Sequence, residues 1–233
     1  MQRKLLDKLR QARAEGLPVA LATRLGDGVQ GLIFDHGSAG DLTLPPDRLA
    51  QVRTMLDEDR SGVLGEGEEE IFVRSYAPAA EIVVVGAVHI SQYLLPMASM
   101  SGLAVRLIDP RRAFASPERF PGLEIVTAWP DEALAAQPPH RRSAVVTLTH
   151  DPKLDDPALE VALNSPAFYI GALGSRRTHA QRLERLTERG FGPEQLARIH
   201  GPAGLDLGSR SPAEIAVSVL AQIIAARHGK ATR

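Results

Sequence analysis

From Glu81 onward the sequence alternates short apolar runs with longer amphipathic stretches, and this rhythm predicts a parallel sheet covered by helices. Ile82 to Val85 is an unbroken β-branched run, as expected for a strand buried on both faces. The later strand candidates are residues 104–108, 124–126, 144–148 and 168–170, and the helix candidates are residues 90–100, 158–164, 177–189 and 212–227. Short connections and right-handed crossovers then give an α/β domain, with a Rossmann-like doubly wound parallel sheet over residues 77–233.

The final helix, residues 212–227, has the clearest start signal in the chain. Ser211-Pro212-Ala213-Glu214 is a capping box with proline at the first helical position. Ile215, Val219 and Ile223 then recur on one face, which is the pattern of an amphipathic helix.

Residues 1–76 have a different character and predict a small α+β domain at the N-terminal end. A charged helix at 2–14 is followed by strands at 19–23 and 31–34, a helix at 46–56 and a strand at 71–75. The turn Gly26-Asp27-Gly28 separates the first two strands. We find no internal repeat.

Composition excludes several classes of function. The 233 residues contain no cysteine, so thiolate nucleophiles, cysteine-ligated zinc and iron–sulfur clusters are impossible. A net charge of −1 gives no general attraction to nucleic acid or to an anionic membrane, and the longest apolar run, 82–88, is too short to span one. Residues 1–25 contain no hydrophobic signal segment, so we expect a soluble cytoplasmic protein with neither nucleic acid nor membrane as a partner.

In doubly wound sheets ligands bind beyond the carboxyl ends of the strands, so the residues after each strand are the candidates for a site. The first strand runs into Gly86-Ala87-Val88-His89-Ile90. Gly86 suits a tight turn, but Val88 occupies the second glycine position of a dinucleotide fingerprint and disfavours NAD(P). The helix N-terminus at His89 still offers N–H groups to an anion. Alternatively, Gly86 only lets the strand turn into the helix.

Asp109-Pro110-Arg111-Arg112 follows the second strand. Asp109 lies 23 residues after Gly86, near the spacing of the carboxylate that accepts ribose hydroxyls, and Arg111 or Arg112 can pair with a phosphate. The alternative is an Asp-Pro turn with solvated arginines.

The densest polar cluster, Thr149 to Pro157, follows the fourth strand. His150 can donate or accept a proton near pH 7, with Asp151 orienting it. One histidine with adjacent carboxylates is a weak ligand set for a divalent metal, so we predict no metal site. Asp155 or Asp156, ahead of Pro157, is interpreted as a helix N-cap.

The fifth strand leads into Gly171 and then Gly174-Ser175-Arg176, where glycines, a capping hydroxyl and arginine precede a helix and predict an anion cradle. Asp206, in a later turn, lines the same cleft or only connects elements. Helix 177–189 is rich in Arg and Glu, which is typical of a solvated face.

Together these motifs resemble the XdhC/CoxI family of maturation factors for molybdenum hydroxylases. The resemblance rests on Gly86-Ala87-x-His89, Asp109-Pro110-Arg111, Trp129-Pro130, Leu148 to Asp151, Tyr169 to Gly171 with Gly174 to Arg176, Gly204 to Asp206 and Pro212 to Ala216. It implies a Rossmann domain joined to a smaller domain, commonly as a homodimer. It also implies transient binding of the molybdenum cofactor (molybdopterin or its nucleotide form), sulfuration through a recruited cysteine desulfurase, and insertion into the apoenzyme of a molybdenum hydroxylase such as xanthine dehydrogenase.

On this interpretation the protein is a non-catalytic chaperone without catalytic residues. The expected cofactor-binding residues are Gly86, Ala87, His89, Ile90, Asp109, Arg111, Thr149, His150, Asp151, Gly171, Gly174, Ser175, Arg176 and Asp206. The alternatives are an NAD(P)- or nucleotide-binding oxidoreductase and a nucleotide-sensing regulatory protein. The chain departs from many relatives at Val88, where they carry glycine, and in lacking a cysteine near the N-terminus.

Overall fold

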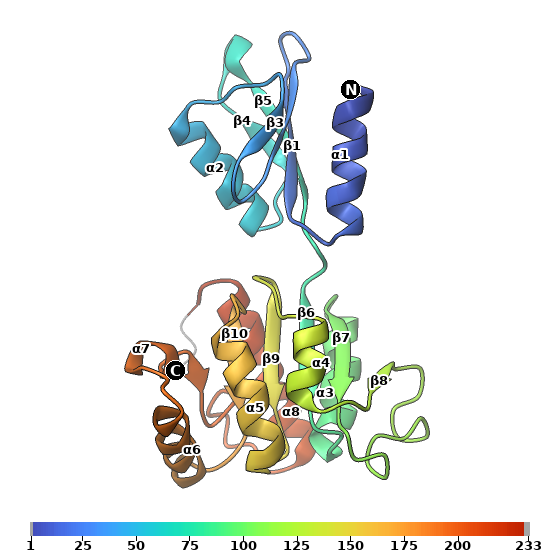
Figure 1. Ribbon diagram of the computed structural model, residues 1–233, viewed down its shortest axis with the longest axis vertical. Helices are drawn as coiled ribbons and strands as arrows, with labels where there is room; N and C mark the ends of the chain where they lie inside the picture. Colours follow the sequence, from blue (N-terminus) through green and yellow to red (C-terminus); the bar gives the residue numbers. More distant parts are fainter. Residues whose placement is uncertain (1, 231–233) are drawn as a thin grey trace. The chain divides into compact units, whose positions relative to one another are not determined.

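The computed structural model describes residues 2–230, which form two compact units (Figure 1). The first unit ends at Pro78 and the second begins at Ala79. Each unit has its own sheet and its own hydrophobic core.

The N-terminal unit is an antiparallel sheet with one helix on each face. Its strands are β1 (Val19–Arg24), β2 (Gln30–Ile33), β3 (Ser38–Gly40), β4 (Gly62–Leu64) and β5 (Ile71–Tyr76), in the order β3-β2-β1-β5-β4. Its helices are α1 (Arg3–Ala14), α2 (Pro46–Asp57) and the 3₁₀ turn η1 (Gly67–Glu69). Alternate residues of β1 enter different cores, Val19 with α1 and Ala20 with α2. The predicted α+β unit is confirmed, while the three-residue strands β3 and β4 were not predicted.

The second unit contains a six-stranded parallel sheet. Its strands are β6 (Glu81–Val85), β7 (Ala104–Ile108), β8 (Ile125–Val126), β9 (Ser143–Thr147), β10 (Tyr169–Ala172) and β11 (Ile199–His200). Their order is β11-β10-β9-β6-β7-β8, so β6 is central and the strand order reverses between β6 and β9. This is the Rossmann strand order, and the predicted doubly wound sheet is confirmed.

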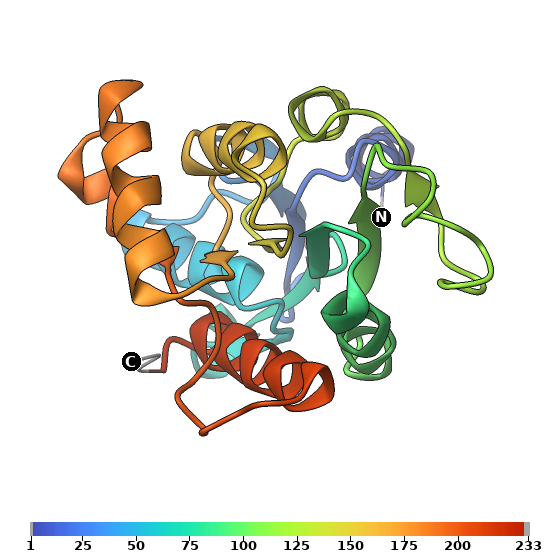
Figure 2. The same cartoon turned by 90° about the horizontal axis from the view of Figure 1, so that it is seen from below.

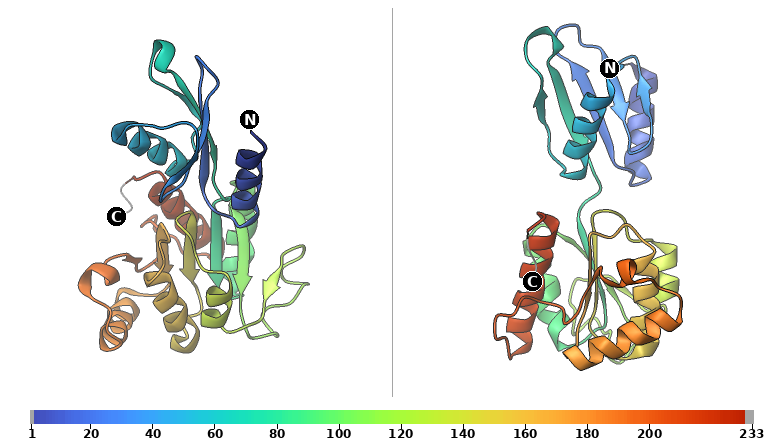
Figure 3. Two further views of the ribbon diagram at one scale, coloured as in Figure 1. Left: turned by 45° about the horizontal axis from the view of Figure 1, so that its top comes forward. Right: turned by 90° about the vertical axis from the view of Figure 1, so that its left-hand side faces the viewer.

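Helices cover both faces of this sheet (Figures 2 and 3). One face carries α3 (His89–Met100) and α8 (Pro212–Arg227). The other face carries α4 (Pro130–Ala136), α5 (Pro152–Leu163) and α6 (Arg176–Glu188). The short helix α7 (Pro193–Leu196) precedes β11. Within β6, Ile82 and Val84 pack toward the first face, and Val83 and Val85 toward the second. The β-branched run is therefore buried on both sides, as its composition predicted.

The predicted start of α5 is wrong. The helix begins at Pro152, and the Asp151 carboxylate accepts the Lys153 N–H at 3.0 Å as the N-cap. Asp155 and Asp156 are not caps, because they lie inside the helix and are 1% and 0% exposed. The proline at the first helical position is Pro152, whereas Pro157 lies within the helix.

Candidate functional site

The turn after β6 packs directly against the loop after β9, at the carboxyl edge of the sheet. Gly86 has φ of 120°, and a Cβ atom added to it would lie 2.7 Å from Cγ2 of Thr149. Only glycine fits this position, since both the backbone conformation and the contact exclude a side chain. At the switch point between β6 and β9, where Rossmann proteins bind dinucleotides, the turn at Gly86 is thus packed tightly against Thr149.

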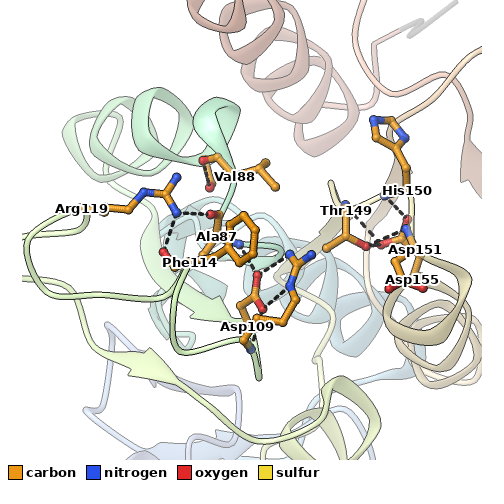
Figure 4. A network of polar contacts seen from close by, with 11 residues as sticks. Ala87, Val88, Asp109, Phe114, Arg119, Thr149, His150, Asp151 and Asp155 are labelled. Atoms are coloured by element: carbon orange, nitrogen blue, oxygen red, sulfur yellow. Dashed lines mark hydrogen bonds and ion pairs between the residues drawn. The ribbon is translucent and has the colours of Figure 1, made fainter.

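Two side chains hold Ala87 in this turn (Figure 4). The Ala87 N–H donates to Oδ2 of Asp109 at 2.8 Å, and the Ala87 carbonyl accepts from Nη1 of Arg119 at 2.9 Å. The same Arg119 nitrogen donates to the carbonyl of Phe114. The Ala87 amide of this turn is therefore already bonded within the protein, whereas the N–H groups at the start of α3 have no side-chain cap.

Asp109 is wholly buried and its oxygens are occupied. Besides the Ala87 N–H, it accepts the backbone N–H, Nε and Nη2 of Arg111 at 2.9, 2.9 and 2.7 Å. Burial pushes the pKa of Asp109 upward, but these hydrogen bonds outweigh it and the pKa lies below its ordinary value. Asp109 anchors the turn and Arg111, and it presents no free carboxylate edge to a ribose.

Arg111 connects this group to the loop after β9. Its guanidinium lies 4.6 Å from the ring centroid of Phe114 and is about one-third exposed. The hydrogen bonds to Asp109 raise the pKa of Arg111, and the charges of Asp151 and Asp155 add to this effect. The arginine is therefore fixed in place with its positive charge toward the edge of the sheet.

Asp155 organises the loop that carries His150. Its carboxylate accepts the Thr149 hydroxyl at 2.6 Å and the His150 N–H at 3.0 Å, and it holds His150 at φ of 62°. The His150 ring is exposed and points away from Asp155 (Figure 4). Its Nδ1 lies near Gly174, where an added Cβ would be 3.7 Å away. Asp151, predicted to orient this imidazole, is used as the cap of α5.

A buried arginine joins the loops after β9 and β10. Arg182 of α6 is 1% exposed, donates from Nη2 to the Leu173 carbonyl at 2.9 Å and lies 3.6 Å from Oδ2 of Asp155. Burial raises the pKa of Asp155 despite the Thr149 and Arg182 contacts. The prediction that helix 177–189 is only a solvated face is wrong for Arg182, which is buried. Its local sequence gave no sign of this, because its ion-pair partner Asp155 lies in α5.

A cavity of about 1190 Å³ opens beside this network. It lies between α6, α7, the start of α8 and the loop 200–209, and it is continuous with the turn after β10. Three predicted site residues, Gly174, Arg176 and Asp206, line it. Sequence reasoning missed its other polar walls, which are His179, Thr187, His200, Ser209, Ser218 and Gln222.

Close packing fixes the loop that forms one wall of the cavity. The His200 ring stacks on Tyr169 at 4.7 Å, and the Gln222 carbonyl oxygen accepts both the Tyr169 hydroxyl and the Gly204 N–H. Gly201 lies against the His179 ring, with no room for a Cβ. The cavity wall is therefore preformed, and the Gly201-Pro202-Ala203-Gly204 cluster was the sequence signal that could have marked it.

The remaining predicted residues take different places along the same edge. Ser175 caps α6 by accepting the Thr178 N–H at 3.1 Å, and Gly171 lies buried in β10 against Tyr169. His89 begins α3 on the exposed side, whereas Ile90 packs partly into the core. The polar residues at this edge thus form two neighbouring groups, with Thr149 and His150 between them. In the closed group, around Asp109, the polar atoms are bonded to one another. In the open group, around Arg176, the side chains line the cavity.

Residues 2–230 include no group of three His, Asp or Glu side chains placed to hold a metal ion. Within the same range, no helix has the length and apolar character required to cross a membrane.

Comparisons with known proteins identify the second unit. Residues 82–223 match the family model described as the XdhC Rossmann domain. The chain is 30% identical over 158 residues to a probable subunit of xanthine dehydrogenase from Bacillus subtilis, covering 67% of this chain and 46% of that protein. It is 40% identical over 85 residues to the molybdenum cofactor insertion chaperone PaoD of Escherichia coli, covering 36% and 27%. The chain therefore spans less than half the length of these relatives.

The fold also resembles a solved structure over almost the whole chain. A crystal structure described as a xanthine dehydrogenase from Bacillus halodurans superposes with a TM-score of 0.65 at 22% identity, covering 98% of this chain and 65% of that one. The matched domain contains the Gly86 turn, the His150 loop and the Arg176 helix start. The sequence match, the strand order and the position of these loops agree, and the chain belongs to the XdhC family.

Proposed function

We propose that this protein binds the molybdenum cofactor as cargo and assists its insertion into a xanthine dehydrogenase-type molybdenum hydroxylase. The names of two relatives, one a molybdenum cofactor insertion chaperone and one a probable part of xanthine dehydrogenase, support this role. The protein acts without turnover, in the cytoplasm, by holding and handing over a cofactor made elsewhere.

The observation that carries the proposal is the cavity at Arg176. Its 1190 Å³ is above the usual range for small-ligand pockets, about 300–1,000 Å³, so a phosphorylated pterin or its nucleotide form fits. Arg176 suits the phosphate at the start of α6, where the Ser175 hydroxyl already accepts the Thr178 N–H, while Asp206 and Ser209 suit the donors and acceptors of a pterin edge. His150, which adjoins Gly174, lies at the border of this space.

The closed group around Asp109 argues against the oxidoreductase alternative. Val88 occupies the second glycine position, Thr149 closes Gly86, and the Ala87 N–H is bonded to Asp109. At the start of α3, whose N–H groups have no side-chain cap, the Val88 side chain crowds the ordinary place of a dinucleotide pyrophosphate. We therefore place the phosphate of the cargo at α6 and disfavour NAD(P).

The absence of cysteine bears on how the cofactor acquires its sulfur. This chain cannot carry a persulfide or ligate molybdenum through a thiolate. We therefore propose that sulfuration is performed by a recruited cysteine desulfurase acting on the bound cargo.

As a separate proposal, the chain works as a homodimer.

The test is an anaerobic titration of the full chain with molybdenum cofactor, together with reconstitution of a hydroxylase apoenzyme. Arg176→Ala should weaken binding at least tenfold and lower reconstitution. Arg177→Ala is the matched control, because this neighbouring arginine is exposed and does not line the cavity. Saturable binding that is equal in wild type and Arg176→Ala would rule out this cavity, and no binding by the wild type would rule out the function.

A further inference from the structure

The outer surfaces of α3 and α8 are nearly free of charge and largely apolar, although α3 also exposes His89 and Ser99. Helix α3 contains no Asp, Glu, Lys or Arg, and α8 contains only Glu214 and Arg227, one near each end. By contrast, α6 on the opposite face of the sheet has six charged residues out of 13. A helix exposed to water normally carries charge on its outer side, so this pair of helices is unusual.

The exposed apolar residues of both helices follow a spacing of three and four. In α8 they are Val217 and Ile224, with the half-buried Ala221 between them, and in α3 they are Tyr93, Pro96 and Met100. The largest exposed fractions are 80% for Met100, 49% for Tyr93, 48% for Val217 and 40% for Ile224. This is the spacing by which helices pack against further helices in bundles.

Together these side chains form one surface, because α3 and α8 pack side by side on the same sheet face (Figure 2). We call it the α3–α8 face; it consists of the exposed Tyr93, Pro96, Met100, Val217 and Ile224 and the half-buried Ala221. Helices of 12 and 16 residues are about 18 and 24 Å long, so the face covers on the order of 400 Å². A patch of this size is the apolar centre of an interface of standard dimensions, about 800 Å² on each partner.

The pattern of α8 is complementary to itself. Val217 and Ile224 lie symmetrically about the point between Leu220 and Ala221, and Glu214 and Arg227 lie symmetrically about the same point. A second α8 running antiparallel therefore brings Val217 of one copy toward Ile224 of the other. It also brings the acidic end at Glu214 toward the basic end at Arg227, with no charge at the centre to desolvate.

We propose that the α3–α8 face is the contact surface between two copies of this chain, with the two α8 helices crossing antiparallel near Ala221. This names the surface of the proposed homodimer and is independent of the identity of the cargo. The arrangement is isologous, as expected for a two-fold dimer.

Light scattering coupled to size-exclusion chromatography tests the surface on the full chain. The wild type should show twice the 25.1 kDa chain mass, and Val217→Glu combined with Ile224→Glu should show the monomer mass. Leu17→Glu combined with Leu25→Glu is the matched control, because these leucines are 47% and 50% exposed on the other unit, and it should remain dimeric. Circular dichroism melting of each variant reports whether it is folded.

Cross-linking supplies a second measurement with a milder substitution. Because the chain has no cysteine, Ala221→Cys introduces a single thiol at the proposed two-fold, and a short bis-maleimide should join two chains. Leu25→Cys should not cross-link. A monomeric wild type would remove both the homodimer and this surface. A dimeric wild type that keeps its mass in the double glutamate variant, or fails to cross-link through Ala221→Cys, would remove this surface alone and leave cofactor binding untouched.

Discussion

The carboxylate of Asp155 lies 3.6 Å from the guanidinium of Arg182, and each side chain is only 2% exposed. Asp155 holds the backbone of Thr149 and His150, and Arg182 holds the Leu173 carbonyl. The pair thus ties the loop after β9 to the loop after β10 beneath the proposed cofactor site. The stability of this ion pair therefore determines how firmly the two loops are held together.

Replacing Arg182 should destabilise the protein strongly. Arg182→Met leaves the Asp155 carboxylate buried without its counter-charge, and we expect a loss of about 3 kcal/mol in the free energy of unfolding near pH 8. Because burial already raises the pKa of Asp155, the loss should be smaller near pH 5, where the carboxyl can take up a proton. Urea denaturation at the two pH values measures this. An equal loss at both would show that Asp155 stays ionised without Arg182.

The two aspartates near the start of α5 should respond differently to substitution. Asp151→Ala removes only a helix cap and should cost about 1 kcal/mol. Asp156→Ala removes a wholly buried carboxylate that receives Nε and Nη2 of Arg185 at 2.6 and 2.9 Å, and should cost about 2–3 kcal/mol. Thermal or urea unfolding of both variants in one buffer gives the comparison. If the Asp151 variant proved the less stable, this division of roles would be incorrect.

The contact between Gly86 and Thr149 can be tested by a paired substitution. Gly86→Ala should destabilise the fold by about 2 kcal/mol or more, through its positive φ and the clash with Cγ2 of Thr149. Adding Thr149→Ser removes that methyl group but keeps the hydroxyl that donates to Asp155, so part of the stability should return. Unfolding free energies of the two single variants and the double variant measure the coupling. Purely additive losses would mean that the clash is relieved elsewhere.

Asp109 should make the free energy of unfolding depend on pH in the acid range. Its pKa in the folded protein lies below the value of 3.8 for an unperturbed Asp, so its contribution is fully present above that pH and is lost as the pH falls through the lower folded value. Asp109→Asn lacks this contribution. The difference in unfolding free energy between wild type and variant should be constant from pH 7 to about 4 and shrink below it. A difference that widens on acidification would contradict the assignment.

His150→Ala should separate function from folding. The side chain is exposed, and the loop is held through the His150 backbone N–H, which the substitution retains. Alanine at φ of 62° is mildly strained, so His150→Asn, which tolerates this conformation, is the control for backbone effects. Both variants should melt near the wild-type temperature and mature the partner hydroxylase less well. Full maturation by both would remove the imidazole from the proposed site.

Several features of this protein follow from short stretches of sequence. The β-branched run at Ile82 predicted a strand buried on both faces, and the capping box at Ser211 predicted the start of α8, because each signal is complete within a few neighbouring residues. The alternation of such elements was sufficient for the Rossmann-like sheet. The start of α5 was assigned wrongly because two Asp/Pro pairs compete there, and their local chemistry is the same.

The roles of the polar residues required the tertiary structure. Asp109 and Ala87 lie 22 positions apart, and Asp156 and Arg185 lie 29 apart, so nothing in their local sequence shows that they bond to each other. The cavity at Arg176 likewise combines α6 with a loop and α8 from later in the chain. Sequence alone predicted most of the longer elements and the edge of the sheet that carries polar groups, whereas β3, β4, β11 and the short helices α4 and α7 were not predicted. Which of those groups are bonded within the protein and which remain open to a ligand depended on long-range packing, because burial and pairing are properties of the folded chain.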